Sequence, residues 1–132
     1  YVARARRFGE IIGECFQIRD DIFDYFSDSA IGKPTGNDMR EGKLTLPAIY
    51  AINSTDRADV REWARKVKTG EATGDDIQNL VEFTKLNGGI DYAEKRMQEL
   101  HDEAVAMLSA WNNPEVRDAL HGYIDFVVER NL

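Results

Sequence analysis

Four polar residues with metal-binding or hydrogen-bonding side chains occur at helical spacing in the segment FQIRDDIFD, residues 16–24. A helix turns about 100° per residue, so Gln17, Asp20, Asp21 and Asp24 would share one arc roughly 100° wide. The apolar residues between them fall on the other sides of the same helix and can bury it against neighbouring helices. The segment therefore predicts a helix with one polar face and one packing face.

The aspartates of this helix repel one another when no cation is bound, which costs about a few tenths of a kcal/mol per pair. A divalent cation that prefers oxygen ligands would convert that cost into binding. Mg²⁺ keeps several waters and commonly joins one or two carboxylates to substrate phosphates, and Asp20 and Asp24, one turn apart, suit that arrangement. The alternative is an ordinary solvated acidic face. The residues that follow in the chain favour the metal site.

A long polar segment follows at residues 27–43. Its glycines, its proline and its short polar side chains predict a loop, and an ordered loop of this length in a compact domain is typically functional. Lys33 and Lys43 each follow a glycine and have the compact charge that binds phosphate, while Asp38 is suited to join the water shell of a metal ion. A flexible linker is the alternative interpretation of the same composition.

The bulk composition limits the classes of function. The chain has 132 residues, 42% of them hydrophobic and 31% charged, which is typical of one soluble globular domain. A net charge of −7 argues against nucleic acid or an anionic membrane surface as the main partner. The only cysteine, Cys15, lies in an apolar helical pattern, so we expect it in the core of a protein from a reducing, cytoplasmic compartment.

Hydrophobic periodicity predicts an all-α fold in a single domain over residues 1–132. We expect helices at residues 1–26, 44–53, 56–67, 75–86, 90–111 and 115–129. Ser54 or Thr55 is the expected cap of the third helix, and Thr73 or Asp75 that of the fourth. His101 is predicted to be a surface residue, and His121 to be packed or exposed rather than a ligand.

Taken together, these motifs closely resemble the C-terminal half of the trans-isoprenyl diphosphate synthases, the polyprenyl synthetases. The resemblance rests on Phe16-Gln17-x-x-Asp20-Asp21-x-x-Asp24, Gly32-Lys33, Gly36-x-Asp38 and Glu41-Gly42-Lys43-x-Thr45-Leu46-Pro47, and it extends to the later helices. It implies helices of an isoprenoid-synthase bundle around a central cavity, in a protein that is usually a homodimer. It also implies Mg²⁺-dependent condensation of isopentenyl diphosphate with an allylic diphosphate.

The resemblance assigns a role to each candidate residue. Asp20 would be a direct metal ligand, with Asp21 and Asp24 supporting the metal and its waters and Asp38 completing the water network. Gln17 would hydrogen-bond near the allylic substrate. Lys33 would contact the allylic diphosphate, and Lys43 would be a weaker contact.

The first aspartate-rich motif of the family is absent from these 132 residues, and the chain opens in mid-helix without a capping signal. We therefore expect the C-terminal part of a longer synthase that cannot catalyse condensation alone. The alternatives are a noncatalytic helical interaction module, a subunit of a heteromeric synthase and, more remotely, a terpene cyclase. The lipid product of a synthase would place the protein near a membrane surface.

Overall fold

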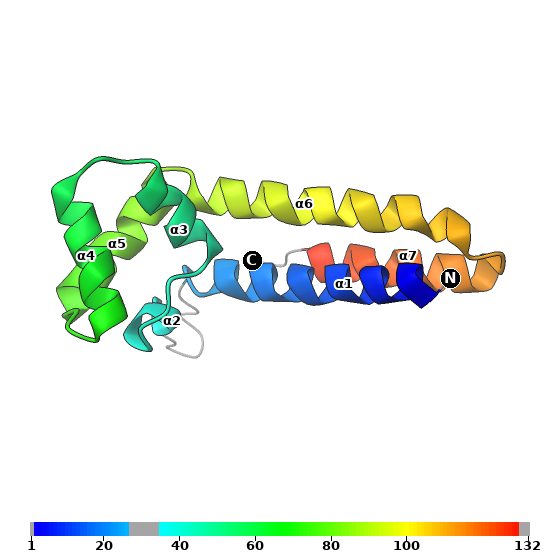
Figure 1. The fold of residues 1–132 in the computed structure, drawn as a ribbon, viewed down its shortest axis with the longest axis horizontal. Coiled ribbons are helices and arrows are strands. Elements are labelled where there is room, and N and C mark those ends of the chain that lie inside the picture. The colour runs from blue at the N-terminus through cyan, green and yellow to red at the C-terminus, as the bar shows by residue number, and fades with distance from the viewer. Residues whose placement is uncertain (1, 27–34, 130–132) are drawn as a thin grey trace. The chain divides into compact units, whose positions relative to one another are not determined.

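The computed structural model describes residues 2–26 and 35–129, and this part of the chain contains helices and no strand (Figure 1). The all-α prediction is confirmed. The α-helices are α1 (Val2–Phe23), α2 (Asn37–Arg40), α3 (Leu46–Asn53), α4 (Ala58–Thr69), α5 (Gly74–Leu86), α6 (Gly89–Met107) and α7 (Pro114–Val128), and a 3₁₀ turn, η1 (Leu108–Ala110), precedes α7.

The described residues form two compact units, and α1 and α6 each contribute to both. In the first unit, residues 2–19 and 94–129, α6 runs antiparallel to both α1 and α7 (Figure 1). Its core contains the fully buried side chains of Ile11, Leu100 and Ile124, one from each helix. Phe8 meets Trp111 edge to face, with ring centroids 5.7 Å apart. The three helices of this unit therefore pack around a shared core of aliphatic and aromatic side chains.

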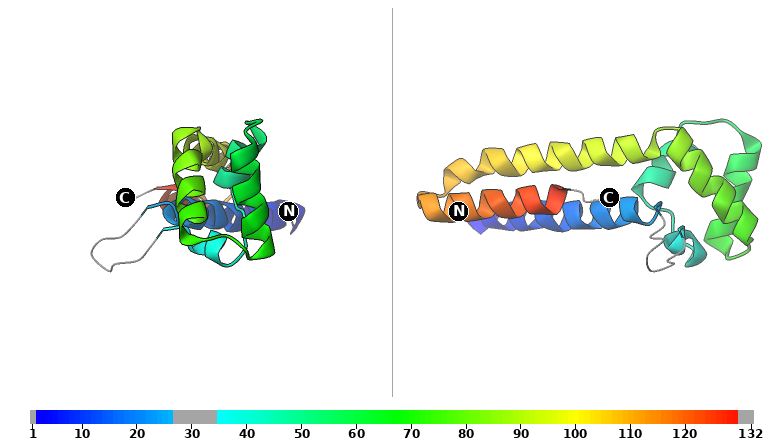
Figure 2. Two further views of the ribbon diagram at one scale, coloured as in Figure 1. Left: turned by 90° about the vertical axis from the view of Figure 1, so that its left-hand side faces the viewer. Right: turned by 180° about the vertical axis from the view of Figure 1, so that it is seen from behind.

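The second unit, residues 20–26 and 35–93, is built on α3, α4 and α5, and α4 and α5 pack side by side (Figure 2). Its core contains the fully buried Val60, Leu80 and Val81. Thr73 begins α5 with a capping box, because its hydroxyl accepts from the Asp76 backbone N–H at 3.1 Å and the Asp76 carboxylate accepts from the Thr73 N–H at 3.0 Å. The unit is therefore held by apolar packing and a reciprocal cap, and the prediction of a single domain stays a prediction.

Several local expectations were wrong. The helix expected over residues 1–26 ends at Phe23, and the one expected over residues 90–111 ends at Met107 and is followed by η1. The segment 27–43 was expected to be a loop throughout, but residues 37–40 form α2, a turn too short to carry a periodic apolar pattern. Neither Ser54 nor Thr55 begins α4: Ser54 ends α3, and the residue that precedes α4 is Arg57, which makes no side-chain cap. The connection between these helices left several polar residues as possible caps, and the structure uses none of them.

In the described ranges, no helix combines the length and apolar character that a membrane span needs.

A glycine at the start of α6 permits its close approach to two other helices. A Cβ atom on Gly89 would lie 2.6 Å from the Pro47 carbonyl oxygen and 2.6 Å from the Thr84 Cγ2 atom. Gly89→Ala should therefore lower the free energy of unfolding by about 1 to 3 kcal/mol, as overpacked cores do, measured by urea denaturation. Gly74, which also begins a helix, has no atom within 4 Å of such a Cβ, so Gly74→Ala is the matched control. Equal stability of the two variants would contradict the packing argument.

Cys15 is fully buried, as expected, and its Sγ lies 3.9 Å from the Met97 carbonyl oxygen. Burial raises the pKa of the thiol to about 11, the charge of Glu14 adds to the rise, and Arg96 opposes it. Folding thus favours the neutral thiol.

At pH about 8 the Cys15 thiolate should be about a hundredfold scarcer in the native protein than in the unfolded chain. Labelling by a chromogenic disulfide reagent should be slowed by at least that factor in the native protein and accelerate as the pH approaches 11. Equal rates in native and urea-unfolded protein would refute the buried thiol.

Candidate functional site

The aspartates at the end of α1 face different environments. Asp20 is exposed, Asp24 is half-buried, and Asp21 is only 6% exposed. Asp20 is thus the member of the group that solvent or a ligand reaches most freely.

Asp24 fixes the start of α2 with both carboxylate oxygens. Its Oδ1 accepts a hydrogen bond from the backbone N–H of Asn37, and its Oδ2 accepts one from that of Asp38, each at 3.0 Å. Its backbone carbonyl also accepts from the Gly36 N–H at 2.9 Å. A carboxylate that accepts N–H groups at a helix start makes strong charge-assisted bonds and satisfies donors that the helix itself cannot. Asp24 therefore positions Asp38 beside the end of α1.

Gly36 permits this turn. It has φ +75°, in the left-handed region that favours glycine, and an added Cβ would lie 2.8 Å from Ile77 Cγ2 and 3.3 Å from Val81 Cγ2. The backbone thus passes close to α5 on its way into α2. The Gly36-x-Asp38 spacing has a physical cause: the glycine lets the chain turn, and the first turn of α2 then presents Asp38.

Charges converge on Asp38. Burial raises the pKa of its carboxyl, the charges of Asp24, Glu41 and Asp20 raise it further, and Lys43 partly offsets them. Among the charges that act most strongly on Asp38, the carboxylates of Asp24, Glu41 and Asp20 outnumber the ammonium of Lys43, so this cluster would be stabilised by a cation.

Lys43 is exposed and lies on the same turn. Its backbone N–H donates to the Asp38 carbonyl at 2.8 Å, and its Nζ pairs with Glu41 at 3.5 Å. An ion pair this exposed is weak, so the ammonium can exchange Glu41 for another anion.

The remaining candidates differ in their surroundings. Gln17 is an exposed residue of α1, three positions before Asp20. Asp21 lies near Tyr25: burial raises the pKa of the phenol, the side chains of Thr45 and Thr84 oppose that rise, and the charges of Asp24 and Asp21 reinforce it. Lys33 lies outside the described residues.

The aspartates do not form a closed cage. Within the described ranges, three His, Cys, Asp or Glu ligand atoms all within 4.8 Å of one another occur only at His101, His121 and Asp125. Asp20, Asp24 and Asp38 are coupled through their charges and stand farther apart. Such spacing is compatible with an ion that keeps several of its waters, as Mg²⁺ does.

The clamp made by Asp24 can be tested by hydrogen exchange. Asp24→Asn replaces one acceptor oxygen by an NH₂ group that faces a backbone N–H, so one of the two bonds to α2 is lost. The amides of residues 36–43 should then exchange about tenfold faster or more, since the loss of a charge-assisted bond costs about 1.5 to 3 kcal/mol. The control is Asp20→Asn, which removes a neighbouring carboxylate charge from an exposed position. If both variants accelerate exchange equally, charge rather than the clamp orders the turn.

The comparisons with known proteins all indicate the same family. The profile of the family described as polyprenyl synthetase matches residues 1–84. The chain is 33% identical over 126 residues to the all-trans-nonaprenyl-diphosphate synthase (geranyl-diphosphate specific) of Rhodobacter capsulatus, covering 95% of this chain and 38% of that protein. It is 30% identical over 128 residues to the octaprenyl diphosphate synthase of Escherichia coli, covering 94% of this chain and 38% of that protein.

Solved structures show the same similarity. The geranylgeranyl pyrophosphate synthase of Bacteroides thetaiotaomicron is 55% identical with a TM-score of 0.90, over 98% of this chain and 42% of that one. A polyprenyl synthase from Caulobacter crescentus, complexed with calcium and isoprenyl diphosphate, is 31% identical with a TM-score of 0.81, over 98% of this chain and 40% of that one. The chain thus spans about 38% of the length of the curated relatives it matches first. On this evidence the chain belongs to the polyprenyl synthetase family.

Proposed function

We propose that the complete protein is a trans-prenyltransferase that joins isopentenyl diphosphate head to tail to an allylic diphosphate in isoprenoid biosynthesis. In this proposal the present chain supplies one wall of the active site, the wall that holds the allylic diphosphate. The observation that carries it is the surplus of negative charge on Asp38, Asp24 and Asp20, held in place by the Asp24 clamp in a member of this family.

The donor set fits Mg²⁺. All of its side-chain ligands are carboxylate oxygens, the type that hard cations prefer, and the exposed Asp20 is free to approach an ion directly. Asp24 has both oxygens in hydrogen bonds to α2, so we assign it to positioning and to the water shell, together with Asp38. The buried Asp21 would support the metal and its waters from the protein interior. When bound, Mg²⁺ would stabilise the negative charge that develops on a departing diphosphate.

The cationic side chains would complete the anion site. Lys43 would leave Glu41 and contact the diphosphate, adding a positive charge where the leaving group gains negative charge. Lys33 is assigned the stronger contact and Gln17 a hydrogen bond near the substrate, both on the family resemblance. No side chain in this set is needed as a general base, because the departing diphosphate can itself accept the proton.

The proposed active site needs two aspartate-rich helices, and this chain supplies one of them. We infer that the other aspartate-rich helix and the basic residues that bind isopentenyl diphosphate lie outside these 132 residues. The 132-residue chain alone should then be inactive. For the complete protein we propose a cytoplasmic homodimer that delivers its lipid product at a membrane surface.

Calorimetry on the 132-residue chain separates metal binding from turnover. Mg²⁺ should bind weakly, with a Kd on the order of a millimolar, and more tightly when inorganic diphosphate is present. Asp20→Asn should weaken the diphosphate-dependent binding by about tenfold or more. Asp56→Asn removes an exposed carboxylate outside the acidic face and should leave binding unchanged.

A turnover assay with isopentenyl diphosphate and an allylic diphosphate completes the test. The chain alone should give no elongated product, whereas the full-length protein should give one that Asp20→Asn abolishes. Elongation by the chain alone would refute the incomplete site. A full-length protein that binds Mg²⁺ and diphosphate without ever forming product would refute the enzyme and leave a noncatalytic binding module.

A further inference from the structure

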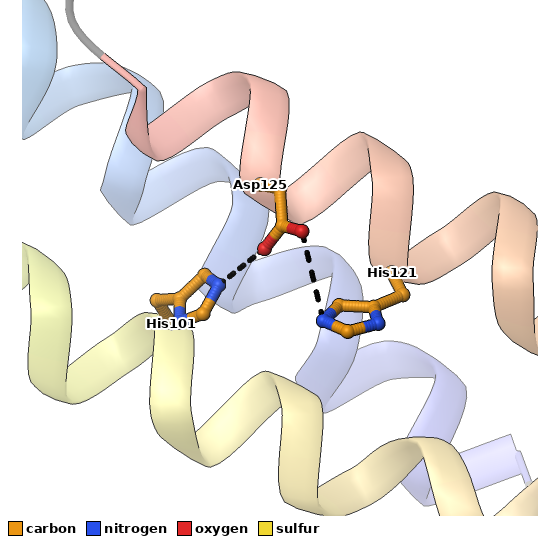
Figure 3. A group of neighbouring side chains, drawn as sticks. All are labelled: His101, His121 and Asp125. Atoms are coloured by element: carbon orange, nitrogen blue, oxygen red, sulfur yellow. Dashed lines mark hydrogen bonds and ion pairs between the residues drawn. The ribbon is translucent and has the colours of Figure 1, made fainter.

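A second group of metal-ligand side chains lies in the first unit, between α6 and α7 (Figure 3). His101 comes from α6, and His121 and Asp125 come from successive turns of α7. The His101 Nε2 atom lies 2.6 Å from Asp125 Oδ1, and the His121 Nε2 atom lies 3.6 Å from Asp125 Oδ2. One ligand atom from each residue can be chosen so that all three lie within 4.8 Å. The α6–η1–α7 hairpin thus brings together residues that stand twenty positions apart.

These distances match the size of a metal ion. Ligand atoms around a tetrahedral zinc ion, with bonds of about 2.0 to 2.1 Å, are about 3.3 Å apart. The two separations, 2.6 Å from His101 Nε2 to Asp125 Oδ1 and 3.6 Å from His121 Nε2 to Asp125 Oδ2, lie on either side of that value. His121 and Asp125 are four residues apart on one helix, the same spacing as that of the two histidines in helical zinc motifs. Small side-chain rotations would therefore bring one ligand atom from each of the three residues within bonding distance of a single ion.

The surroundings of His101 favour a cation at its Nε2 atom. Its Nδ1 atom lies 3.1 Å from Asp102 Oδ1, which also accepts from Gln98 Nε2 at 3.0 Å. Both ring nitrogens therefore face carboxylate oxygens, although a neutral imidazole has only one N–H to donate. Metal-bound histidines commonly donate their second nitrogen to a carboxylate, as Nδ1 is placed to do toward Asp102. A metal ion at Nε2 would then take the place of the second proton.

We propose that His101, His121 and Asp125 bind a divalent transition-metal ion of the zinc type and that this ion links α7 to α6. Two imidazoles and one carboxylate select such ions over Mg²⁺ and Ca²⁺, which prefer oxygen ligands. Three protein ligands leave a fourth position for water. The side chains of His101 and His121 are 17% and 50% exposed, so an ion in solution can reach them. This proposal is independent of the prenyl transfer chemistry.

The role that follows is structural or regulatory. Contacts along α7 include the edge-to-face pair of Phe16 and Tyr123 and the Arg19 guanidinium 5.7 Å from the centroid of the Phe126 ring, both on partly exposed rings. An ion that ties α7 to α6 would strengthen the attachment of this last helix. The expectation that His121 is packed or exposed rather than a ligand does not hold under this proposal, because that expectation considered His121 alone.

The test uses chain without a histidine tag, at a pH well above the usual imidazole pKa of about 6.5. Zn²⁺ titrated in a calorimeter should bind at one equivalent, and the apparent Tm should rise with Zn²⁺ concentration. Co²⁺ should give the visible absorption of a four-coordinate ion, and a large excess of Mg²⁺ should not displace it. His121→Ala, at an exposed position, should weaken Zn²⁺ binding by about tenfold or more and abolish the Tm rise, as should Asp125→Asn.

Two controls locate the ion. Asp118→Asn removes an exposed carboxylate from the same helix and should leave Zn²⁺ binding unchanged. Asp20→Asn tests whether Zn²⁺ binds the acidic face instead, and it too should have no effect. The proposal is overturned if Zn²⁺ fails to bind at about 100 μM, or if binding survives His121→Ala and Asp125→Asn. It is equally overturned if Asp20→Asn is the variant that removes binding.

Discussion

The carboxylate of Asp24 is the constraint on which the acidic face depends. By accepting two backbone N–H groups at the start of α2, it fixes Asp38 beside the end of α1 and so concentrates negative charge in one place. The hydrogen bonds that order the turn also bring like charges together, and burial first, then the charges of Asp24, Glu41 and Asp20, raise the pKa of Asp38. A cation bound beside these carboxylates would offset the repulsion between them.

Glycines set the distances that make this arrangement possible. At Gly36 the left-handed backbone passes close to Ile77, and at Gly89 the start of α6 lies against Pro47 and Thr84. In both places a single methyl group would overlap atoms of the second unit's interior. Close backbone approach here substitutes for side-chain packing, and it determines where the turn carrying the acidic residues can lie.

Sequence periodicity was sufficient to place the long helices, and local chemistry was sufficient where a motif lay within a few residues. The core position of Cys15 followed from the pattern of neighbouring residues, and the structure selects Thr73 from the two caps, Thr73 and Asp75, that the sequence left open. The α2 turn did not, because four residues carry no period and its start is fixed by Asp24, thirteen positions earlier. The burial of Asp21 was equally hidden, since a helical arc gives a direction and does not reveal what packs against it. The roles assigned to the candidate residues, namely Gln17, Asp20, Asp21, Asp24, Lys33, Asp38 and Lys43, stay predictions.

The two candidate metal sites illustrate how ligand chemistry can keep different ions apart on one chain. The acidic face offers only carboxylate oxygens at spacings that leave room for water, which favours a hard ion carrying its own shell. The α6–α7 cluster offers two imidazole nitrogens and one carboxylate within bonding reach of a single ion, which favours a softer ion held directly by protein.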